Sequence, residues 1–369
     1  MPEINDFLRL MIKNEASDLF FSAGTPLHMK IDGVLTVVQD KPLGGKGIAA
    51  LTDSIMSEQQ RKAFNDRPEM NLGLQIDGYG RFRVNIFRQR GAVAMVIRYL
   101  KDKIPSIAEL NLPLVLEELV MKPRGLILAV GATGAGKSTT LASMLDYRNK
   151  HSRSHILTIE DPVEYVHHYQ KSVVNQREVG IDTDSYEDAL MNAMREAPDV
   201  ILIGEIRERS TMQHAIAYAE TGHLCLSTLH GSNASHVLER IVTFFPKDMH
   251  AQLFMDLAHN LTAIVSQRLV RDHQGKRVPA VEVMLISPLI RDLISKGKID
   301  EIREAMERSS EPGMQTFDQS LFHLYKEGRI SEEKAMENAE SQSNLGVRIR
   351  LDKGEAPDNK DLTTEAMGS

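Results

Sequence analysis

The sequence lacks most features of secreted, membrane-spanning or nucleic-acid-binding proteins. Its 369 residues include one cysteine, Cys225, so no disulfide can form within the chain, which fits a reducing cytoplasm. No run approaches the roughly 18 apolar residues that a membrane-spanning helix needs, and the amino-terminal segment lacks the pattern of a signal peptide. The net charge of −7 argues against a dedicated nucleic-acid-binding protein. We therefore expect a cytoplasmic protein without a transmembrane segment or a nucleic-acid partner.

What the sequence does contain divides into two parts that differ in hydrophobic pattern. In the first part, residues 1–100, short amphipathic segments alternate with turn signals, which predicts a small α+β domain. Arg81 and Arg83 fall on one face of an expected strand, with apolar residues on the other face. The expected elements are a helix over 3–16, strand-like runs over 18–23 and 27–38, a helix over 57–64 and two strands over 77–100 joined at Arg90-Gly91. The run over 27–38 is expected to form a hairpin that turns at Asp32-Gly33.

The second part reads as an α/β domain. Residues 101–113, with two prolines and no long periodicity, are interpreted as a linker, and the domain is expected over 114–345. Apolar runs without alternation, separated by segments that could form helices, are typical of buried parallel strands. These runs are 125–131, 155–160, 199–205 and 223–229. A helical section is expected over about 247–345, and the charged residues 346–369 are expected to form a disordered tail.

The segment GATGAGKST carries the most specific signal in the chain. It matches the Gly-x4-Gly-Lys-Ser phosphate loop, and it lies between an apolar run and a segment that could form a helix. Its glycines let the backbone wrap a phosphate group, Lys137 reaches the β and γ phosphates, and Ser138 offers its hydroxyl to Mg²⁺. The sequence therefore predicts ATP and Mg²⁺ as ligands. The predicted nucleotide-binding residues are Gly131, Ala132, Thr133, Gly134, Ala135, Gly136, Lys137, Ser138 and Thr139.

A nucleoside triphosphatase also needs a carboxylate near the metal ion and a group that orients the attacking water. Glu205 follows the apolar run DVILIG, so it is expected at the end of a buried strand beside the phosphate loop. The segment HILTIEDPVE supplies three more acids, Glu160, Asp161 and Glu164, and any of these could accept a proton from water. The residues alone do not choose among the three, and each is also compatible with a solvated acid on a loop.

Two histidines, His223 and His230, bracket the run LCLSTL. If this run is a strand, its length separates them by roughly 23 Å, which excludes a metal ion shared by both. The preceding glycine is a stop signal for a helix, so His223 is expected at the start of the strand. His230 is then expected at the carboxyl end, where parallel α/β sheets place their ligand sites.

Four segments together resemble the secretion ATPase superfamily, which powers type IV pili and type II secretion. GATGAGKSTT, ILTIEDPVEYVH, DVILIGEIRE and TGHLCLSTLHGSNA are similar, in this order, to its Walker A motif, Asp box, Walker B motif and His box. The resemblance reaches about residue 345. It implies an α/β fold in which a small PAS-like α+β domain joins a RecA-like P-loop ATPase core with a helical carboxy-terminal section.

Within the superfamily, the short amino-terminal region and the absence of a tetracysteine zinc site indicate the retraction branch, PilT and PilU. The segment SPLIRDLI, residues 287–294, occupies the place of an Ala-Ile-Arg-Asn motif in PilT-like proteins. It keeps Arg291 but has Leu289 and Asp292 where that motif has alanine and asparagine. This departure favours the PilU type, an accessory retraction ATPase.

The resemblance also implies roles for single residues. Glu164 matches the proposed water-activating carboxylate, Glu205 matches the acid that holds Mg²⁺ through water, and His230 matches the residue near the γ-phosphate. His223 and Arg291 match positions of coupling or interface residues, although His223 is equally compatible with a structural cap. Family members form homo-hexamers in which arginines of one amino-terminal domain complete the site of a neighbour. Arg81, Arg83 and Arg98 lie in the matching hairpin.

These expectations combine into an ATP-hydrolysing ring motor that supports type IV pilus retraction beside a PilT-like ATPase. Its further partner would be the inner-membrane pilus platform protein, bound peripherally at the cytoplasmic face. Three alternatives remain. A nucleic-acid motor is disfavoured by the acidic balance, and an assembly or secretion ATPase is disfavoured by the missing zinc site. A non-motor subunit that docks on a PilT-like ring stays open because of the altered SPLIRDLI segment.

Overall fold

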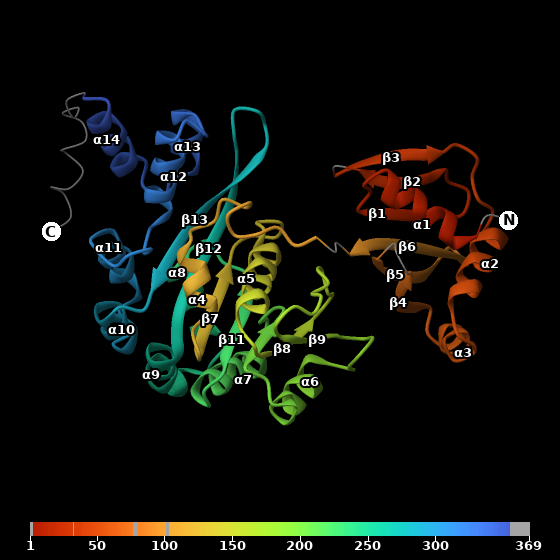
Figure 1. The fold of residues 1–369 in the computed structure, drawn as a ribbon, viewed down its shortest axis with the longest axis horizontal. Coiled ribbons are helices and arrows are strands. Elements are labelled where there is room, and N and C mark those ends of the chain that lie inside the picture. The colour runs from red at the N-terminus through yellow and green to blue at the C-terminus, as the bar shows by residue number, and fades with distance from the viewer. Residues whose placement is uncertain (1–2, 32, 77–79, 101–102, 355–369) are drawn as a thin grey trace. The chain divides into compact units, whose positions relative to one another are not determined.

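The computed structural model describes residues 3–31, 33–76, 80–100 and 103–354. The chain forms two units, and each is described by itself (Figure 1). Unit 1 comprises Met1–Ile104, Asp161–His168 and Arg177–Ser185, and unit 2 comprises Pro105–Glu160, Tyr169–Gln176 and Tyr186–Ser369. Two short segments that lie after Glu160 in the sequence therefore group with the amino-terminal part.

Unit 1 is an antiparallel sheet of six strands, in the order β3-β2-β1-β6-β5-β4, with three helices. The strands are β1 (Asp18–Phe21), β2 (Leu27–Ile31), β3 (Val34–Gln39), β4 (Glu69–Ile76), β5 (Gly80–Gln89) and β6 (Ala92–Leu100). The helices are α1 (Ile4–Lys13), α2 (Gly45–Ile55) and α3 (Glu58–Asp66). The predicted α+β class is confirmed, while α2 and β4 were not predicted.

The core of unit 1 follows from the alternation of side chains along β5. Phe82, Val84 and Ile86 are buried and belong to one apolar cluster with residues of α1. The turn to β6 falls at Arg90-Gly91, as predicted, and both residues have positive φ, 52° and 77°. Two consecutive positive φ values are the geometry that matches the twist of a two-residue hairpin. In the other predicted hairpin Gly33 has φ 81°, and Asp32 lies outside the described residues.

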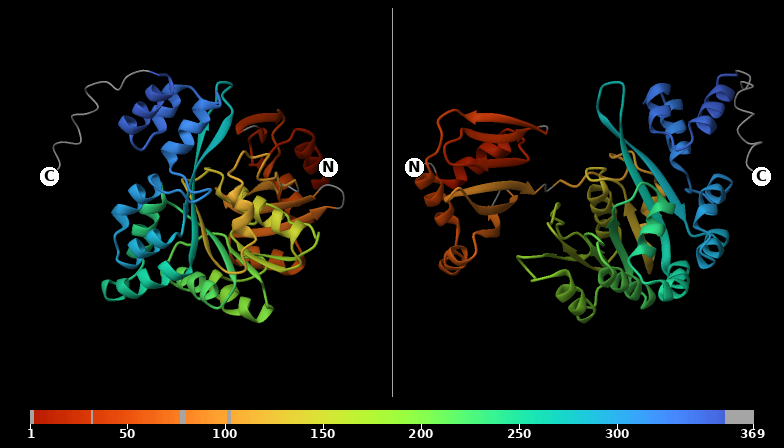
Figure 2. Two further views of the ribbon diagram at one scale, coloured as in Figure 1. Left: turned by 60° about the vertical axis from the view of Figure 1, so that its left-hand side comes forward. Right: turned by 180° about the vertical axis from the view of Figure 1, so that it is seen from behind.

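Unit 2 is built on a sheet of seven strands in the order β13-β12-β7-β11-β10-β8-β9. Helices cover both of its faces (Figures 1 and 2). The strands are β7 (Gly125–Val130), β8 (His155–Glu160), β9 (Val173–Glu178), β10 (Val200–Ile203), β11 (Leu224–Leu229), β12 (Leu261–Arg271) and β13 (Arg277–Leu285). The last two residues of β9 group with unit 1.

The helices of unit 2 follow the strands in a largely alternating order. They are α4 (Val115–Val120), α5 (Lys137–His151), α6 (Tyr186–Ala193), α7 (Arg209–Glu220), α8 (Ala234–Thr243), α9 (His250–Asn260), α10 (Pro288–Ser295), α11 (Ile302–Glu307), α12 (Phe317–Lys326), α13 (Glu332–Asn338) and α14 (Gln342–Asp352). None of the helices within the described residues is long and apolar enough to span a membrane.

The four apolar runs of the sequence are the strands β7, β8, β10 and β11, and neighbours among them pair in parallel. Every residue of β7, β10 and β11 is buried, since both faces of the sheet are covered. Because these strands are parallel, their carboxyl ends meet at one edge of the sheet, where the phosphate loop begins.

Two expectations about the second half of the chain are wrong in part. The section over 247–345 is not helical throughout, because it contains the antiparallel pair β12 and β13, and β12 also pairs in parallel with β7. The expected tail, 346–369, begins inside helix α14, whose Leu345 and Ile349 are buried against α12. Residues 355–369 lie outside the described residues.

The expected linker, 101–113, also differs from the structure. Residues from Pro105 onward belong to unit 2, and Ile107 and Leu112 are buried in the same apolar cluster as β7. Ser143 of α5 donates a hydrogen bond to the carbonyl of Pro105. The two prolines thus lie in a segment that packs on the α/β core.

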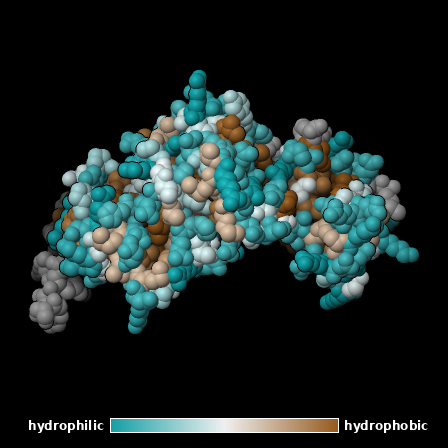
Figure 3. All heavy atoms as spheres, turned by 90° about the horizontal axis from the view of Figure 1, so that it is seen from below, coloured by the Kyte–Doolittle hydropathy of each residue, from teal (hydrophilic) through white to brown (hydrophobic). Residues whose placement is uncertain are grey.

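The surface that Figure 3 shows is mainly hydrophilic, with smaller hydrophobic areas on each unit. Val34, Leu35 and Val37 of the edge strand β3 are among the exposed apolar side chains.

Candidate nucleotide-binding site

The phosphate loop connects the end of β7 to the start of α5. Gly134 and Gly136 have φ of 79° and 94°, a region that residues with a Cβ rarely adopt, and Gly136 is the N-cap of α5. Lys137 folds back over the loop, and its Nζ donates to the carbonyls of Gly131 at 2.9 Å and Ala132 at 3.0 Å. Ser138 and Thr139 follow in the first turn of the helix. The helix amino terminus, the ammonium group and the hydroxyl groups thus converge where an anionic phosphate would bind.

Gln267 of β12 braces this loop, and the sequence analysis missed it. Thr140 Oγ1 donates to Gln267 Oε1 at 2.6 Å, and both side chains are buried. A Cβ on Gly136 would lie 2.8 Å from Gln267 Nε2, and one on Gly131 would lie 2.5 Å from the Gln267 carbonyl oxygen. The glycines are therefore required for the close approach of β12 as well as for backbone conformation. A glutamine inside the apolar run LTAIVSQRLV was the available signal.

A second group of polar side chains lies at the ends of β10 and β11. His230 Nε2 is 2.9 Å from Glu205 Oε1, so the two predicted residues are brought together. The guanidinium of Arg207 contacts the other carboxylate oxygen, with Nε and Nη2 both 2.7 Å from Oε2. The side chain of Glu205 is only 17% exposed, against 38% for His230 and 65% for Arg207. Arg207 was not predicted, although it lies two residues after Glu205 in the Walker B-like segment.

Hydrogen bonds on both sides of Glu205 hold its backbone in place. Ile206 N donates to the Thr228 carbonyl at 3.0 Å, and Thr228 Oγ1 donates back to the Gly204 carbonyl at 2.7 Å. A Cβ on Gly204 would lie 3.1 Å from Glu160 Cα, which shows how closely the ends of β8 and β10 approach. Glu160 accepts a hydrogen bond from Thr158 Oγ1 at 2.7 Å. Of the three acids left open by the sequence, Glu160 is thus held in unit 2.

The other two acids and the three arginines belong to unit 1. Glu164 is exposed within the segment Asp161–His168. Arg83 Nε lies 3.3 Å from Glu178 Oε1, and Arg83 Nη2 lies 3.8 Å from Asp161 Oδ1. Burial raises the pKa of Glu178, and the charge of Arg83 opposes that rise. Arg83 therefore compensates a buried carboxylate within its own unit.

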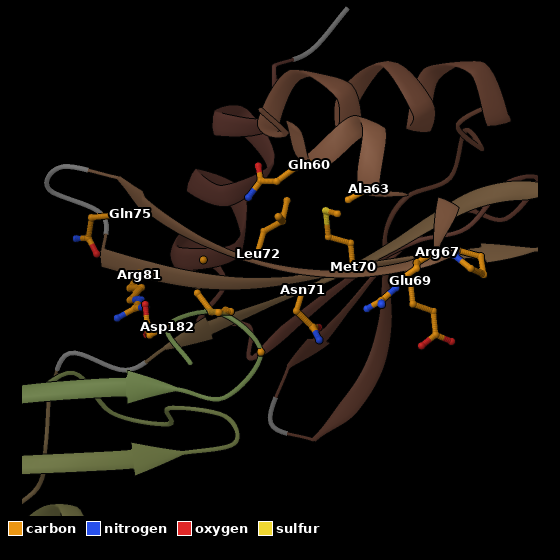
Figure 4. A pocket seen from close by; sticks show the side chains of 14 residues that line it. Gln60, Ala63, Arg67, Glu69, Met70, Asn71, Leu72, Gln75, Arg81 and Asp182 are labelled. Atoms are coloured by element: carbon orange, nitrogen blue, oxygen red, sulfur yellow. The ribbon is translucent and has the colours of Figure 1, made fainter. Parts of the chain in front are cut away.

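The remaining two arginines differ from each other. Arg98 Nε forms a 2.8 Å ion pair with Asp18 Oδ1 across the β1–β6 pair. Arg81 lines a pocket of about 1060 Å³ along β4 and α3, together with Asn71, Gln75 and Asp182 (Figure 4). No phosphate-loop residue lines this pocket. The three arginines share a sheet but not a common environment.

His223 and Arg291 lie away from the phosphate loop. His223 precedes β11, whose six buried residues separate it from His230, and its Nδ1 lies 3.1 Å from Thr221 Oγ1. Its carbonyl accepts a hydrogen bond from Gly125 N at the start of β7. Arg291 of α10 is exposed and lines a pocket of about 450 Å³ that also includes Gly125. Both residues are therefore at the amino-terminal edge of the parallel strands.

The residues at the phosphate loop fit Mg²⁺ as a nucleotide-bound ion. Within the residues that the structure describes, no group of three or more His, Cys, Asp and Glu could hold a metal by itself. Mg²⁺ commonly keeps several waters and takes one or two protein ligands together with phosphate oxygens. A hydroxyl at Ser138 and a carboxylate at Glu205 suit that mode.

A parallel sheet with a glycine-rich phosphate loop at its carboxyl edge, a helix starting at Lys137 and a carboxylate on a nearby strand define a P-loop nucleotide-binding protein of the α/β class. Residues 1–334 match the family described as "Type II/IV secretion system protein". The chain belongs to this family of ATPases.

Individual relatives place it more narrowly. The chain is 49% identical to the type IV pilus ATPase PilU of Pseudomonas aeruginosa, over 99% of this chain and 96% of that protein. It is 41% identical to PilT of the same organism, named as a type IV pilus retraction ATPase, over 93% of this chain and all of that protein. A crystal structure of the pilus retraction motor PilT with bound ADP superposes with a TM-score of 0.86 at 40% identity, covering 94% and 99% of the two chains. The predicted PilT/PilU branch is confirmed, with more identity to PilU.

Proposed function

We propose that this chain is an ATP-hydrolysing motor that supports type IV pilus retraction, as a PilU-type accessory to a PilT-like motor. The observation that carries the proposal is the pairing of a complete phosphate loop with the 2.9 Å Glu205–His230 contact at the neighbouring strand ends. The 49% identity to PilU along nearly the whole chain supports the biological role.

The residues of unit 2 have separate roles in binding the phosphates and Mg²⁺. Lys137 leaves the Gly131 and Ala132 carbonyls to bind the β and γ phosphates, while the amino terminus of α5 faces the anion. Mg²⁺ supplies charge neutralisation when bound, with Ser138 as a direct ligand and Glu205 holding one of its waters. His230, already in contact with Glu205, responds to the γ-phosphate. Its ring thereby links the presence of that phosphate to the end of β11.

Residues of unit 1 complete the reaction in this proposal. Glu164 is exposed, so its carboxylate can reach a water molecule and suits the group that activates it. Arg81, Arg83 and Arg98 stabilise charge on the phosphates of a neighbouring subunit. This arrangement requires a ring, and we propose a homo-hexamer.

The proposed setting is the cytoplasmic face of the inner membrane. There the ring acts with a PilT-like ATPase and the pilus platform protein, without a membrane segment or a nucleic-acid partner of its own. ATP hydrolysis drives a conformational change, because contacts with the γ-phosphate exist in only one state of the cycle. The proposed domain division is an amino-terminal domain over 1–100 and an ATPase domain that begins at Pro105, in place of the expected linker over 101–113.

A second candidate is a non-motor subunit that docks on a PilT-like ring. It is favoured by one feature, the SPLIRDLI segment at α10, where Leu289 and Asp292 flank Ile290 and Arg291. In a cell, this candidate predicts that a protein unable to hydrolyse ATP supports retraction as well as the wild type does.

One substitution tests both candidates. Lys137→Ala removes the ammonium group, so we expect ATP turnover by the purified protein to be lost, while Lys150→Ala on the exposed end of the same helix keeps normal turnover. Normal hydrolysis by Lys137→Ala would refute the site. In a deletion strain, Lys137→Ala should fail to restore retraction under load, and restoration would favour the non-motor subunit.

A further inference from the structure

The loop that carries His230 lies between β11 and α8, and it is held by residues from the carboxy-terminal helices. We propose that Glu340, between α13 and α14, is a positioning residue for this loop. It acts through two hydrogen-bond partners, Arg268 of β12 and Asn233 of the loop. The inference rests on the proposed role of His230 in ATP hydrolysis.

Glu340 is the point where the loop and β12 meet. Its Oε1 accepts a 2.6 Å charge-assisted hydrogen bond from Arg268 Nη2 and a 2.9 Å hydrogen bond from Asn233 Nδ2. The same Arg268 nitrogen lies 3.2 Å from the carbonyl of Ser232. One carboxylate oxygen and one guanidinium group therefore fix two successive residues of the loop, directly after His230 and Gly231.

Glu340 is itself held in place. Its backbone N donates to Asp318 Oδ1 at 2.7 Å, and the next N, that of Ser341, donates to Asp318 Oδ2 at 3.0 Å. Arg303 of α11 also donates to Asp318 Oδ2, at 2.9 Å. The Glu340 side chain is 11% exposed, so its contacts are shielded from water and stronger than a surface ion pair.

Arg268 has little freedom to choose another partner. Its guanidinium carbon lies 4.0 Å from the centroid of the Phe317 ring, and its Nη1 donates to the Asn338 carbonyl at 3.1 Å. Because the guanidinium stacks on a ring and donates a hydrogen bond through Nη1, its plane is fixed and Nη2 points in one direction. That direction is toward Glu340 and the loop.

The two sides of the loop are fixed differently. On one side a Cβ on Gly231 would lie 2.3 Å from Val237 Cγ2 and 3.2 Å from Val130 Cγ1, so the backbone has no room to move there. On the other side a cavity of about 530 Å³, lined in part by Ser232, Asn233 and Glu340, leaves space. Packing alone does not hold the loop on the cavity side, and the Glu340 contacts supply the restraint.

Positioning through the loop has a kinetic signature. The phosphate loop binds most of the nucleotide, whereas His230 senses the γ-phosphate, so a displaced His230 slows the chemical step more than it weakens ATP binding. We expect Glu340→Gln, which keeps the shape but removes the charge, to lower kcat about tenfold with KM for ATP changed less than twofold. Asn233→Ser keeps an N-cap hydroxyl for α8 and removes the amide donor, and it should show the same split.

The decisive measurement is a double-mutant cycle on the full chain. If Glu340 acts through the loop, Glu340→Gln combined with His230→Gln is no slower than His230→Gln alone. If the double variant instead lowers kcat by the product of the two single reductions, the inference is overturned. A wild-type kcat in both Glu340→Gln and Asn233→Ser would overturn it as well. Thermal unfolding of each variant shows whether a loss of kcat merely follows a loss of folded protein.

Glu337→Gln is the matched control. Glu337 lies exposed on α13, where its carboxylate forms a 2.6 Å ion pair with Lys334 of the same helix. Its substitution should leave kcat and KM unchanged. Failure of the proposed function is seen separately, because it would show as normal turnover in Lys137→Ala. Loss of turnover in Lys137→Ala with wild-type kinetics in Glu340→Gln would refute this inference alone.

Discussion

Thr140 Oγ1 lies 2.6 Å from Gln267 Oε1, and this buried hydrogen bond joins the first turn of α5 to strand β12. The two residues are 127 positions apart in the chain. Because β12 also pairs with β7, the phosphate loop is attached to the sheet at its start through β7 and at its end through Gln267. The loop is thereby held in shape before any nucleotide binds, which lowers the entropy cost of binding phosphate.

We predict that Gln267→Met weakens ADP binding about tenfold, since it leaves the Thr140 hydroxyl buried without its acceptor and frees the loop. Isothermal titration with ADP measures this. Thr140→Val removes the donor instead, and the double variant should bind no more weakly than the worse single variant. Gln274→Met, in the exposed turn after β12, serves as the control. Unchanged ADP affinity in Gln267→Met would mean that β12 does not brace the loop.

The second prediction concerns the competition for Glu205. Both of its carboxylate oxygens already have partners, one in His230 and the other in Arg207, so a Mg²⁺-bound water in the proposed mechanism would compete with these contacts for the carboxylate. Arg207 is largely exposed, and exposed ion pairs contribute up to about 1 kcal/mol. Arg207→Gln should therefore lower the half-saturating Mg²⁺ concentration of the ATPase by up to about fivefold.

A titration of turnover with Mg²⁺ at saturating ATP tests this point. Arg195→Gln, an exposed arginine bonded to Asn192, should leave the Mg²⁺ dependence unchanged. A higher Mg²⁺ requirement in Arg207→Gln would show that the arginine helps to place Glu205 for the metal.

The third prediction is a pH dependence of stability. Glu282 of β13 is buried beside α8, where its Oε1 accepts hydrogen bonds from Ala234 N and Ser266 Oγ. Burial raises its pKa from 4.5 to about 7, and the nearby Glu340 adds to the rise while Arg268 opposes it. The folded state therefore keeps a proton that the unfolded state releases. This contribution to stability is full below pH 4.5, is lost as the pH rises to about 7, and amounts to about 3 kcal/mol.

Glu282→Gln keeps an oxygen acceptor and cannot ionise. We expect the free energy of unfolding of this variant, relative to the wild type, to increase between pH 5 and pH 7 by about 2 kcal/mol and to change little above pH 8. Urea unfolding at pH 5, 6, 7 and 8 gives the comparison. Parallel curves for the two proteins would show that Glu282 ionises normally.

The parts of the site that could be predicted from the sequence are those that short segments encode. The phosphate loop, Glu205 and His230 each follow an apolar run whose length and composition mark a buried strand. Arg207 lies in the same short segment as Glu205, but it was not predicted because it matches no position of a motif with a known role. Gln267 is a polar residue in an apolar run, but its role could not be predicted, because only the pairing of β12 with β7 brings it to its partner Thr140.

The incorrect predictions about the fold also concern segments whose structure depends on tertiary contacts. Strand β12 lies between β7 and β13 and is buried along most of its length, so its apolar residues show no alternation that would distinguish a strand from a buried helix. Residues 105–113 look like a linker in composition, and only tertiary packing of Ile107 and Leu112 shows otherwise. Helix α14 has a charged sequence in which few residues are buried, which is the composition of a tail.

That helix supplies the last prediction. Leu345 is 1% exposed and packs in one cluster with Phe317 and Leu321 of α12, whereas Leu351 on the same helix is 58% exposed. Leu345→Ala should lower the free energy of unfolding of unit 2 by about 3 kcal/mol, because it removes buried methyl groups and leaves a cavity. Leu351→Ala should change it by less than about 0.5 kcal/mol. Urea unfolding distinguishes the two, and equal effects would mean that α14 does not pack on α12 in solution.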